Sequence, residues 1–167
     1  MFDLRSIQKP LKDQFRASPQ SAQIMLVARG RQTTSPLVCL VDVGNTVYQA
    51  EAHQGVGGAG MAVSSGDLFL AALAACAQIT CQMVAASMGM PVDEIGVTVE
   101  GDLDLRGALG ISPDAPVGFE EIRVYFDVKA PQATEDQQHK LRERTEQHCL
   151  VMQTLLRSPT IYSGWLI

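Results

Sequence analysis

The chain has 167 residues, of which 46% are hydrophobic and 19% charged, a size and composition typical of one globular domain, 1–167, with one core. The formal charge of -5, with basic residues scattered along the chain, argues against a nucleic-acid partner, because phosphate binding needs clustered Lys and Arg. The first residues carry charges and no apolar stretch, so they do not resemble a secretory signal, and we expect a cytoplasmic protein.

Three strands are predicted after a polar N-terminal arm of residues 1–20. Residues 22–29 and 36–43 are hydrophobic runs, and Gly44-Asn45 supplies a turn before a third run at 46–52. This spacing predicts a three-stranded meander.

A glycine-rich segment, residues 53–65, follows these strands. Its GVGGAG stretch matches G-x-G-x-x-G, the pattern of dinucleotide-binding turns. In that motif the third glycine opens a helix and an acidic residue follows about twenty positions later in a βαβ unit, and neither condition holds here. We therefore predict a flexible glycine loop.

A long apolar helix is predicted next. Residues 64–67, Ser-Ser-Gly-Asp, fit a capping box, and the helix runs from about Asp67 to Met88, before Gly89 and Pro91. Its uncharged length could cross a bilayer, but its alanines, its polar residues and the lack of a flanking basic cluster favour a helix inside a protein, so no membrane partner is expected. Apolar residues cover nearly its whole circumference, and a chain this small can hardly enclose it, which favours a homodimer.

The rest of the chain predicts two further strands, a second helix and a closing strand. Residues 97–105 and 122–128 alternate apolar and polar side chains, as half-buried strands do, and a long loop joins them. Thr134 begins a helix that is charged at first and apolar between Cys149 and Leu156. The last residues, TIYSGWLI, are predicted to form one strand, and the whole pattern indicates an α+β fold.

Four cysteines are the main candidates for chemistry. Cys39, Cys76, Cys81 and Cys149 would be reduced in a cytoplasmic protein, so they are either buried thiols or redox residues. Cys76 and Cys81 lie about 140° apart around a helix and cannot hold one metal ion, and the three histidines show no ligand spacing. No metal or other cofactor is therefore expected, and Cys39 and Cys81 are interpreted as packing residues.

Three segments, SSGDLFLAALAAC, GDLDLRG and TEQHCLVMQTL, resemble the osmotically inducible protein C and organic hydroperoxide resistance family in their order and spacing. The resemblance extends from about residue 50 to residue 156. It implies an OsmC-like fold in which antiparallel strands wrap the long apolar helix of an entwined homodimer, with each active site near the subunit interface. It also implies a cysteine pair that reduces organic hydroperoxides, with Cys76 as attacking thiol, Cys149 as resolving thiol, and a thiol reductant of unknown identity.

The attacking thiol needs help to ionise. Cys76 is about ten residues inside its helix, beyond the reach of the helix dipole, so a cation must lower its pKa. Family members use an Arg from the N-terminal strands and a Glu before the Cys helix; here Arg29 or Arg31 could be that Arg. Gly66 stands in the place of the Glu, and the nearest acid, Asp67, is also placed to cap the helix.

A second departure follows Cys149. Leu150 stands where the family usually has Pro, so nothing in the sequence requires a helix to restart at Cys149. Both departures indicate a divergent subgroup.

Two other functions stay open. One is a binding module, in which the same dimer holds a small apolar ligand in a cleft lined by Phe69, Met83, Met88 and Met152 and the cysteines are ordinary. The other is an inert dimeric scaffold. Both predict unreactive thiols, whereas a redox pair requires Cα atoms within about 7 Å of each other.

Overall fold

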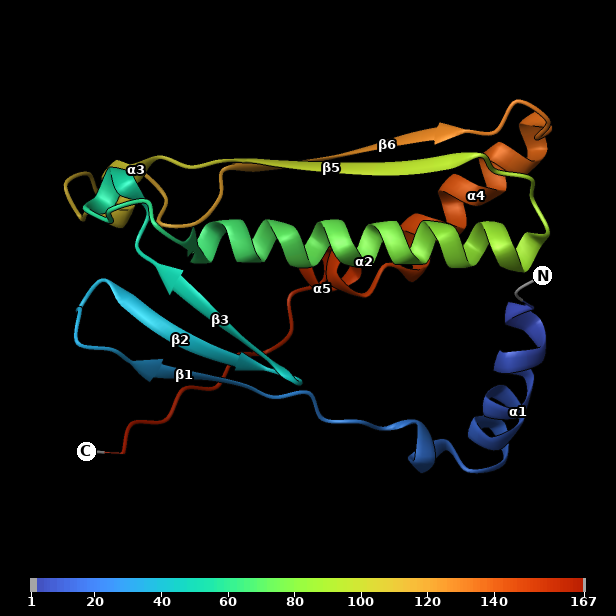
Figure 1. Cartoon of the computed structure of the whole chain (residues 1–167), viewed down its shortest axis with the longest axis horizontal. Helices are drawn as coiled ribbons and strands as arrows, with labels where there is room; N and C mark the ends of the chain where they lie inside the picture. The colour runs from blue at the N-terminus through green and yellow to red at the C-terminus, as the bar shows by residue number, and fades with distance from the viewer. Residues whose placement is uncertain (1–2, 167) are drawn as a thin grey trace. The chain divides into compact units, whose positions relative to one another are not determined.

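The computed structural model describes residues 3–166, which form two compact units (Figure 1). Unit 1 consists of the residues up to Ala71 together with Val99–Val124. Unit 2 consists of Ala72–Thr98 together with the residues from Tyr125 onward. Helices and strands both contribute, so the predicted α+β class is confirmed.

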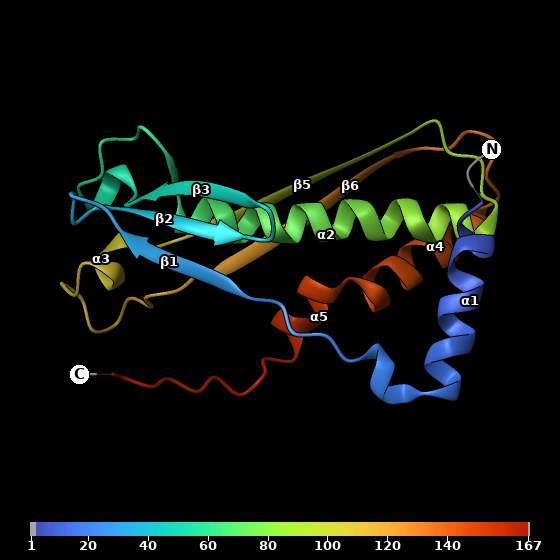
Figure 2. The same cartoon turned by 60° about the horizontal axis from the view of Figure 1, so that its bottom comes forward.

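A small sheet forms much of unit 1. Strands β1 (Ala28–Gln32), β2 (Val38–Val43) and β3 (Thr46–Glu51) are antiparallel in this order, and β4 (Val63–Ser64) pairs in parallel with β3. Gly44 makes the turn between β2 and β3 with φ +56°, a conformation that glycine adopts at little cost. The predicted meander is confirmed, and Figures 1 and 2 show its three strands side by side.

The first predicted strand, 22–29, is wrong over most of its length. Residues 24–27 have no regular structure, and Ile24, Met25 and Leu26 are 80%, 86% and 79% exposed. β1 pairs Ala28 with Val43, and the chain turns away from β2 directly after Val43. The residues before Ala28 therefore have no β2 residue opposite them, and their backbone cannot extend the ladder.

The polar N-terminal arm contains a helix that the sequence analysis missed. Helix α1 (Leu4–Ala17) begins after Asp3, whose carboxylate accepts hydrogen bonds from the amides of Arg5 at 3.0 Å and Ser6 at 3.3 Å. A short 3-10 helix, η1 (Pro19–Ala22), follows it. The signal was present in the sequence as a capping Asp before apolar residues spaced three and four apart.

The glycine-rich loop is folded around Glu51 and is not the flexible segment predicted. The Glu51 side chain is buried, and its carboxylate accepts hydrogen bonds from the amides of Ala59, Met61 at 2.9 Å and Ala62 at 3.1 Å. These amides, that of Ala59 above all, hold the pKa of Glu51 below its ordinary value. Gly58 lies against the carbonyl of Ala52, where a Cβ atom would overlap the oxygen. The loop, which includes the 3-10 helix η2 (Gln54–Val56), is thus fixed from both sides.

Glu51→Gln should lower the melting temperature by several degrees, because the neutral amide loses the charge and presents only one acceptor oxygen to the loop amides. The Glu51 pKa is lower in the folded protein, so its stabilisation is complete above the ordinary Glu pKa and is lost as the pH falls through the folded value. Thermal denaturation of both proteins at neutral and acid pH tests this, and the difference should shrink in acid. Glu143→Gln on an exposed helix position is the control, and equal melting temperatures for all three proteins would contradict the prediction.

Helix α2 (Ser65–Met88) begins with the predicted capping box. The Ser64 amide and hydroxyl both donate to the Asp67 carboxylate at 2.8 Å, and the Asp67 amide donates to the Ser64 hydroxyl at 3.2 Å. Ser64 is also the last residue of β4, so the chain passes from strand to helix without a loop. The helix ends at Gly89, which has φ +64°.

Strands β5 (Glu94–Asp102) and β6 (Glu121–Lys129) form a separate two-stranded ribbon. The amide of Asp93 donates to Lys129 at 2.8 Å and that of Glu120 donates to Asp102 at 2.9 Å, so the strands are antiparallel. Half-buried and exposed positions alternate along most of both strands, as predicted, but β5 ends at Asp102 and not at Leu105. The segment between them contains the short helix α3 (Leu105–Ala108), where a loop was predicted.

The core of unit 2 joins the second half of α2 to the segments after it. Its buried residues are Cys81, Val84, Ala85, Met90, Ala130 and Leu141. Helix α4 (Glu135–His148) begins with a capping box between Thr134 and Gln137. The predicted second helix is in fact two, because the chain is extended at Cys149 before α5 (Leu150–Leu156) begins (Figure 2).

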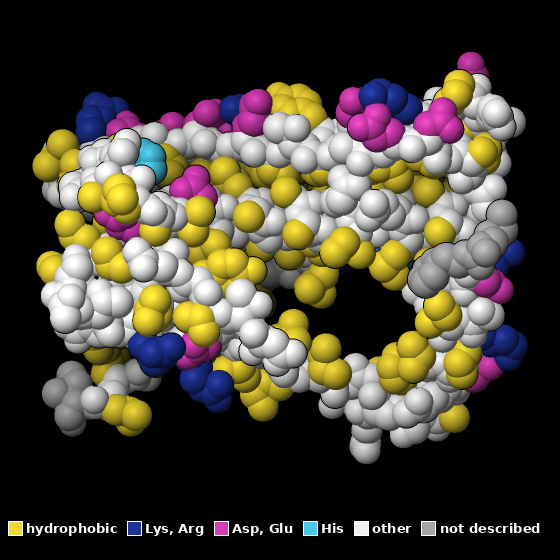
Figure 3. All heavy atoms as spheres, viewed as in Figure 1, with side chains coloured by type: hydrophobic (Ala, Val, Ile, Leu, Met, Phe, Trp, Pro, Cys, Tyr) yellow, Lys and Arg dark blue, Asp and Glu magenta, His cyan; other side chains and the backbone are white. Residues whose placement is uncertain are grey.

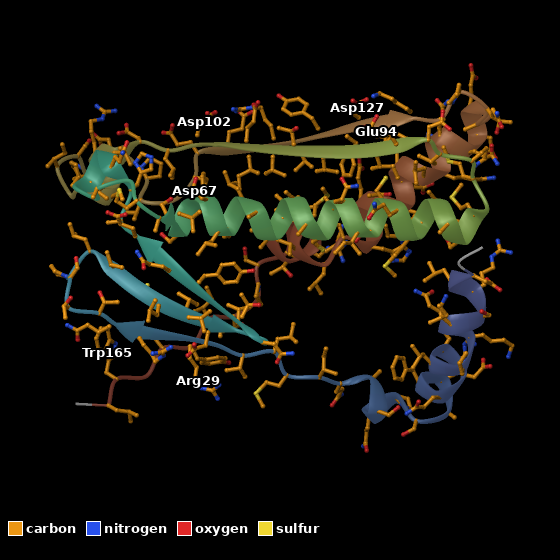
Figure 4. The ribbon with its side chains drawn as sticks, in the orientation of Figure 1. Arg29, Asp67, Glu94, Asp102, Asp127 and Trp165 are labelled. Atoms are coloured by element: carbon orange, nitrogen blue, oxygen red, sulfur yellow. The ribbon has the colours of Figure 1, made fainter. Side chains whose placement is uncertain are left out.

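The predicted C-terminal strand is wrong. Residues 157–166 have no regular structure, and Ile161 and Trp165, the latter labelled in Figure 4, are 88% and 84% exposed. An apolar composition favours a strand only where a neighbouring backbone offers hydrogen bonds, and residues 157–166 pair with no strand that the structure describes.

Helix α2 keeps an uncovered apolar face. Ile79 is 55% exposed and Met83 is 40% exposed, and Figure 3 shows hydrophobic side chains at the surface over this helix. The helix is long and apolar enough to cross a membrane, and 28% of its most apolar window is buried. The sequence argument that one chain cannot enclose this helix therefore agrees with its surroundings, while the dimer itself stays a prediction.

Candidate functional site

Cys76 and Cys149, the two predicted redox residues, are in contact within unit 2. Cys76 lies in α2 and Cys149 between α4 and α5; both are free thiols, and their side chains are within hydrogen-bonding reach of each other. The amide of Val151 donates to the Cys76 sulfur at 3.5 Å. Two thiols 73 positions apart in the sequence therefore share one small site.

The two sulfurs differ in accessibility. Cys149 is fully buried, at 0% exposure, whereas Cys76 is half-buried. Burial raises the pKa of the Cys149 thiol, and the neighbouring Cys76 acts in the same direction, against the amides of Met152 and Val151. Cys149 is therefore protonated at neutral pH, and Cys76 is the thiol that a dissolved substrate can reach more easily.

The interruption between helices α4 and α5 at Cys149 places a backbone donor beside the sulfurs. The Cys149 amide donates to the Thr145 carbonyl at 3.0 Å as the last bond of α4, and its carbonyl accepts from Gln153 at 2.9 Å as the first bond of α5. A helix thus restarts at Leu150 although no Pro is present, which corrects the sequence interpretation. The Val151 amide belongs to the first turn of α5, where helix amides have no partner within the helix. The sequence analysis missed this donor because a backbone amide leaves no residue-type signal.

The other two cysteines, Cys39 and Cys81, have surroundings typical of packing residues. Cys81 is 2% exposed in the core of unit 2, and burial raises the pKa of its thiol. Cys39 is half-buried in β2 of unit 1. Both environments fit the predicted packing roles.

The two candidate arginines both lie on β1 but differ in their ion pairing. The Arg31 guanidinium forms two hydrogen bonds of 3.0 Å with the Asp42 carboxylate on β2. Arg29, labelled in Figure 4, forms no ion pair within 4 Å among residues 3–166. Both lie in unit 1, so the activation of Cys76 by either of them stays a prediction.

Asp67 serves as a helix cap. Its carboxylate is bound to Ser64, whose amide contributes most to the lowered pKa of Asp67. It precedes Cys76 by nine residues, about 13 Å along the helix axis. Gly66, in the place of the family's Glu, brings no carboxylate to this turn, which Figure 4 shows at the start of α2.

The residues predicted to line the cleft of a binding module come from both units, so that cleft stays a prediction. Phe69 stacks on Phe119 within unit 1, with ring centres 5.5 Å apart. Unit 2 has an open pocket of about 300 Å³, but Met83, Met88 and Met152 are not among its lining residues. That pocket is lined by Gln82, Ala85, Ala86, Met90, Val92, Asp93, Glu94 and Ile95. Among residues 3–166, no cluster of three or more His, Cys, Asp or Glu side chains could hold a metal ion.

The comparisons with known proteins place this site in a family. A model of the family described as OsmC-like protein matches residues 57–163. The chain belongs to the OsmC-like family. The match covers Cys76 and Cys149 and confirms the resemblance seen in the sequence, whereas α1 and the whole meander lie before it.

Solved structures confirm the OsmC-like fold. An OsmC-like protein from Mycoplasma pneumoniae is 13% identical, with a TM-score of 0.67 over 81% of this chain and 90% of that one. Organic hydroperoxide resistance proteins from Legionella pneumophila and Elizabethkingia anophelis are 17% and 19% identical, with TM-scores of 0.60 and 0.61. Both alignments cover 82% of this chain; they cover 92% of the Legionella pneumophila chain and 91% of the Elizabethkingia anophelis chain. A search of curated proteins found no match. Helix α2 is therefore an element of an OsmC-like fold.

Proposed function

We propose that this OsmC-like protein is a cytoplasmic thiol peroxidase that reduces organic hydroperoxides through a Cys76–Cys149 cycle. Family membership supports a role in peroxide stress. The observation that carries the mechanism is the contact between a half-buried thiol and a fully buried one in the same unit. That arrangement suits an attacking and a resolving sulfur.

In the first step, the Cys76 thiolate attacks the terminal oxygen of the hydroperoxide. An S–O bond forms, the O–O bond breaks, and the alkoxide leaves as an alcohol after taking a proton, so the sulfur is oxidised to sulfenic acid and the peroxide reduced. The Val151 amide, which donates to the Cys76 sulfur, lies beside the atom that reacts.

In the second step, the Cys149 sulfur attacks the oxidised Cys76 sulfur. A disulfide forms, and hydroxide leaves as water with the proton released by Cys149. The raised pKa of Cys149 keeps it protonated until this step, so that Cys76 meets the peroxide first. An external thiol reductant, which the protein does not supply, returns both cysteines to the reduced state.

The functional unit in this proposal is a homodimer with each active site near the subunit interface. The uncovered face of α2 supports it, because Ile79 and Met83 would otherwise remain in water. A face of small and apolar residues without charges is what a second copy of the same helix could cover.

Stoichiometric titration of the reduced protein with cumene hydroperoxide tests the proposal. Peptide mass spectrometry without reduction should find one Cys76–Cys149 disulfide per equivalent of peroxide, with Cys39 and Cys81 still reduced as internal controls. Four unreacted thiols would contradict the peroxidase and favour the non-catalytic dimer that binds a small molecule.

A further inference from the structure

Helix α1 has an apolar face that its own unit leaves exposed. Ile7, Leu11 and Phe15 are 50%, 46% and 38% exposed, and the main contact of the helix within unit 1 is the short η1. An isolated helix of 14 residues is only marginally stable in water, and Pro10 inside α1 removes one backbone hydrogen bond. A surface that covers the apolar face is therefore needed to keep α1 helical.

The charges on α1 are as unevenly distributed as its apolar residues. Arg5, Lys9, Lys12 and Arg16 fall within an arc of about 60° around the helix, and Leu4, Ile7, Leu11 and Phe15 within another of about 80°. These 14 residues carry four of the 13 basic residues in a chain whose net charge is negative. Their only acid, Asp13, forms ion pairs with Lys9 at 2.6 Å and Arg16 at 2.9 Å, so four positive charges and one negative leave the helix with a net charge of +3. Figure 3 shows basic side chains at the outer edge of the helix, with acidic side chains beside them.

The surface that covers α1 must therefore be apolar and anionic at once. The exposed face of α2 is apolar, but α2 carries no charged residue after Asp67, so it cannot neutralise the basic arc. The exposed side of β5 and β6 is mostly polar, and two of its acidic residues, Glu100 and Asp102, are already paired with Arg123. An anionic lipid surface combines both properties, since acyl chains accept the apolar residues and headgroup phosphates the basic ones.

We propose that α1 docks the protein on anionic lipid bilayers, with the helix lying in the plane of the interface. The sequence expectation of no membrane partner rested on the character of α2 as a spanning segment, and a surface helix does not conflict with a soluble fold. The proposal is independent of the cysteine chemistry, because α1 lies outside the residues that the family model matches.

Flotation of the full-length protein with vesicles tests the proposal. The protein should float with vesicles of phosphatidylcholine and phosphatidylglycerol, remain unbound with phosphatidylcholine alone, and be released by high salt. Lys9→Glu combined with Lys12→Glu should weaken binding at least about twentyfold. Leu11→Ser, which keeps every charge, should also weaken it because it removes an apolar contact.

The matched control is Lys140→Glu combined with Arg142→Glu, which makes the same charge change on exposed positions of α4. This control should float like the wild type. Absence of flotation with anionic vesicles, or equal losses in the two charge-reversed proteins, would overturn the proposal. It would also be overturned if the α1 variants changed the oligomeric state in size-exclusion chromatography without changing flotation, because α1 would then dock on a second copy.

Discussion

Cys76→Ser should reduce the consumption of cumene hydroperoxide to the background rate of buffer. The serine hydroxyl is not ionised near neutral pH, and its oxygen cannot be oxidised to the equivalent of a sulfenic acid. The substitution is nearly isosteric at a half-buried position, so the fold should be retained. Peroxide consumption measured with an excess of dithiol reductant would show the loss directly.

Three further variants, each with one cysteine replaced, serve as the comparisons for this result. Cys149→Ser should consume one equivalent of peroxide and then hold Cys76 as sulfenic acid, which dimedone labels, because the resolving thiol is missing. Cys39→Ser and Cys81→Ser should remain nearly as active as the wild type. Wild-type activity in Cys76→Ser would reject it as the attacking thiol, and complete loss in Cys39→Ser or Cys81→Ser would show that the pair was wrongly chosen.

The parts of this fold that could be predicted are those whose signals lie within a few residues. The α2 capping box depends on Ser64 and Asp67, three positions apart, and the half-buried strands depend on alternation along one segment. The strand at 22–29 failed because the length of its partner β2, and not its own composition, decided where pairing ended. The residues before Ala28 contain no information about the turn at Gly44, which ends β2 and leaves them without a partner.

The site could be predicted only as far as residue types carry information. Two cysteines in a recognisable order suggested the pair, and the structure brings them into contact. The position of the Val151 amide beside Cys76 depends on the interruption between α4 and α5 at Cys149, which occurs without a proline. The sequence could not choose between Arg29 and Arg31, and the structure adds only that Arg31 is the one hydrogen-bonded to Asp42, so the choice stays a prediction.

Arg29→Ala should slow the oxidation of Cys76 at pH 7 by at least about tenfold, whereas Arg31→Ala should leave it almost unchanged. Arg31 is held by Asp42 through two hydrogen bonds, so its charge is already paired within the sheet. Arg29 lies two positions earlier on the same strand, opposite Asp42, but forms no ion pair within 4 Å among residues 3–166, so we predict that its guanidinium serves the thiolate. A thiol without a cation near it is only a few per cent ionised at neutral pH.

The pH dependence distinguishes activation from a structural effect. If Arg29 stabilises the Cys76 thiolate, the rate of sulfenic acid formation in Arg29→Ala should recover as the pH rises above the ordinary thiol pKa, and Arg29→Lys should restore much of the rate at pH 7. Stopped-flow measurement of Cys76 oxidation across this pH range provides the profile for both arginine variants. A loss that persists at high pH would mean that Arg29 binds or positions the peroxide. A larger loss in Arg31→Ala than in Arg29→Ala would mean that Arg31 leaves Asp42 to serve the thiolate, and it would reverse the assignment.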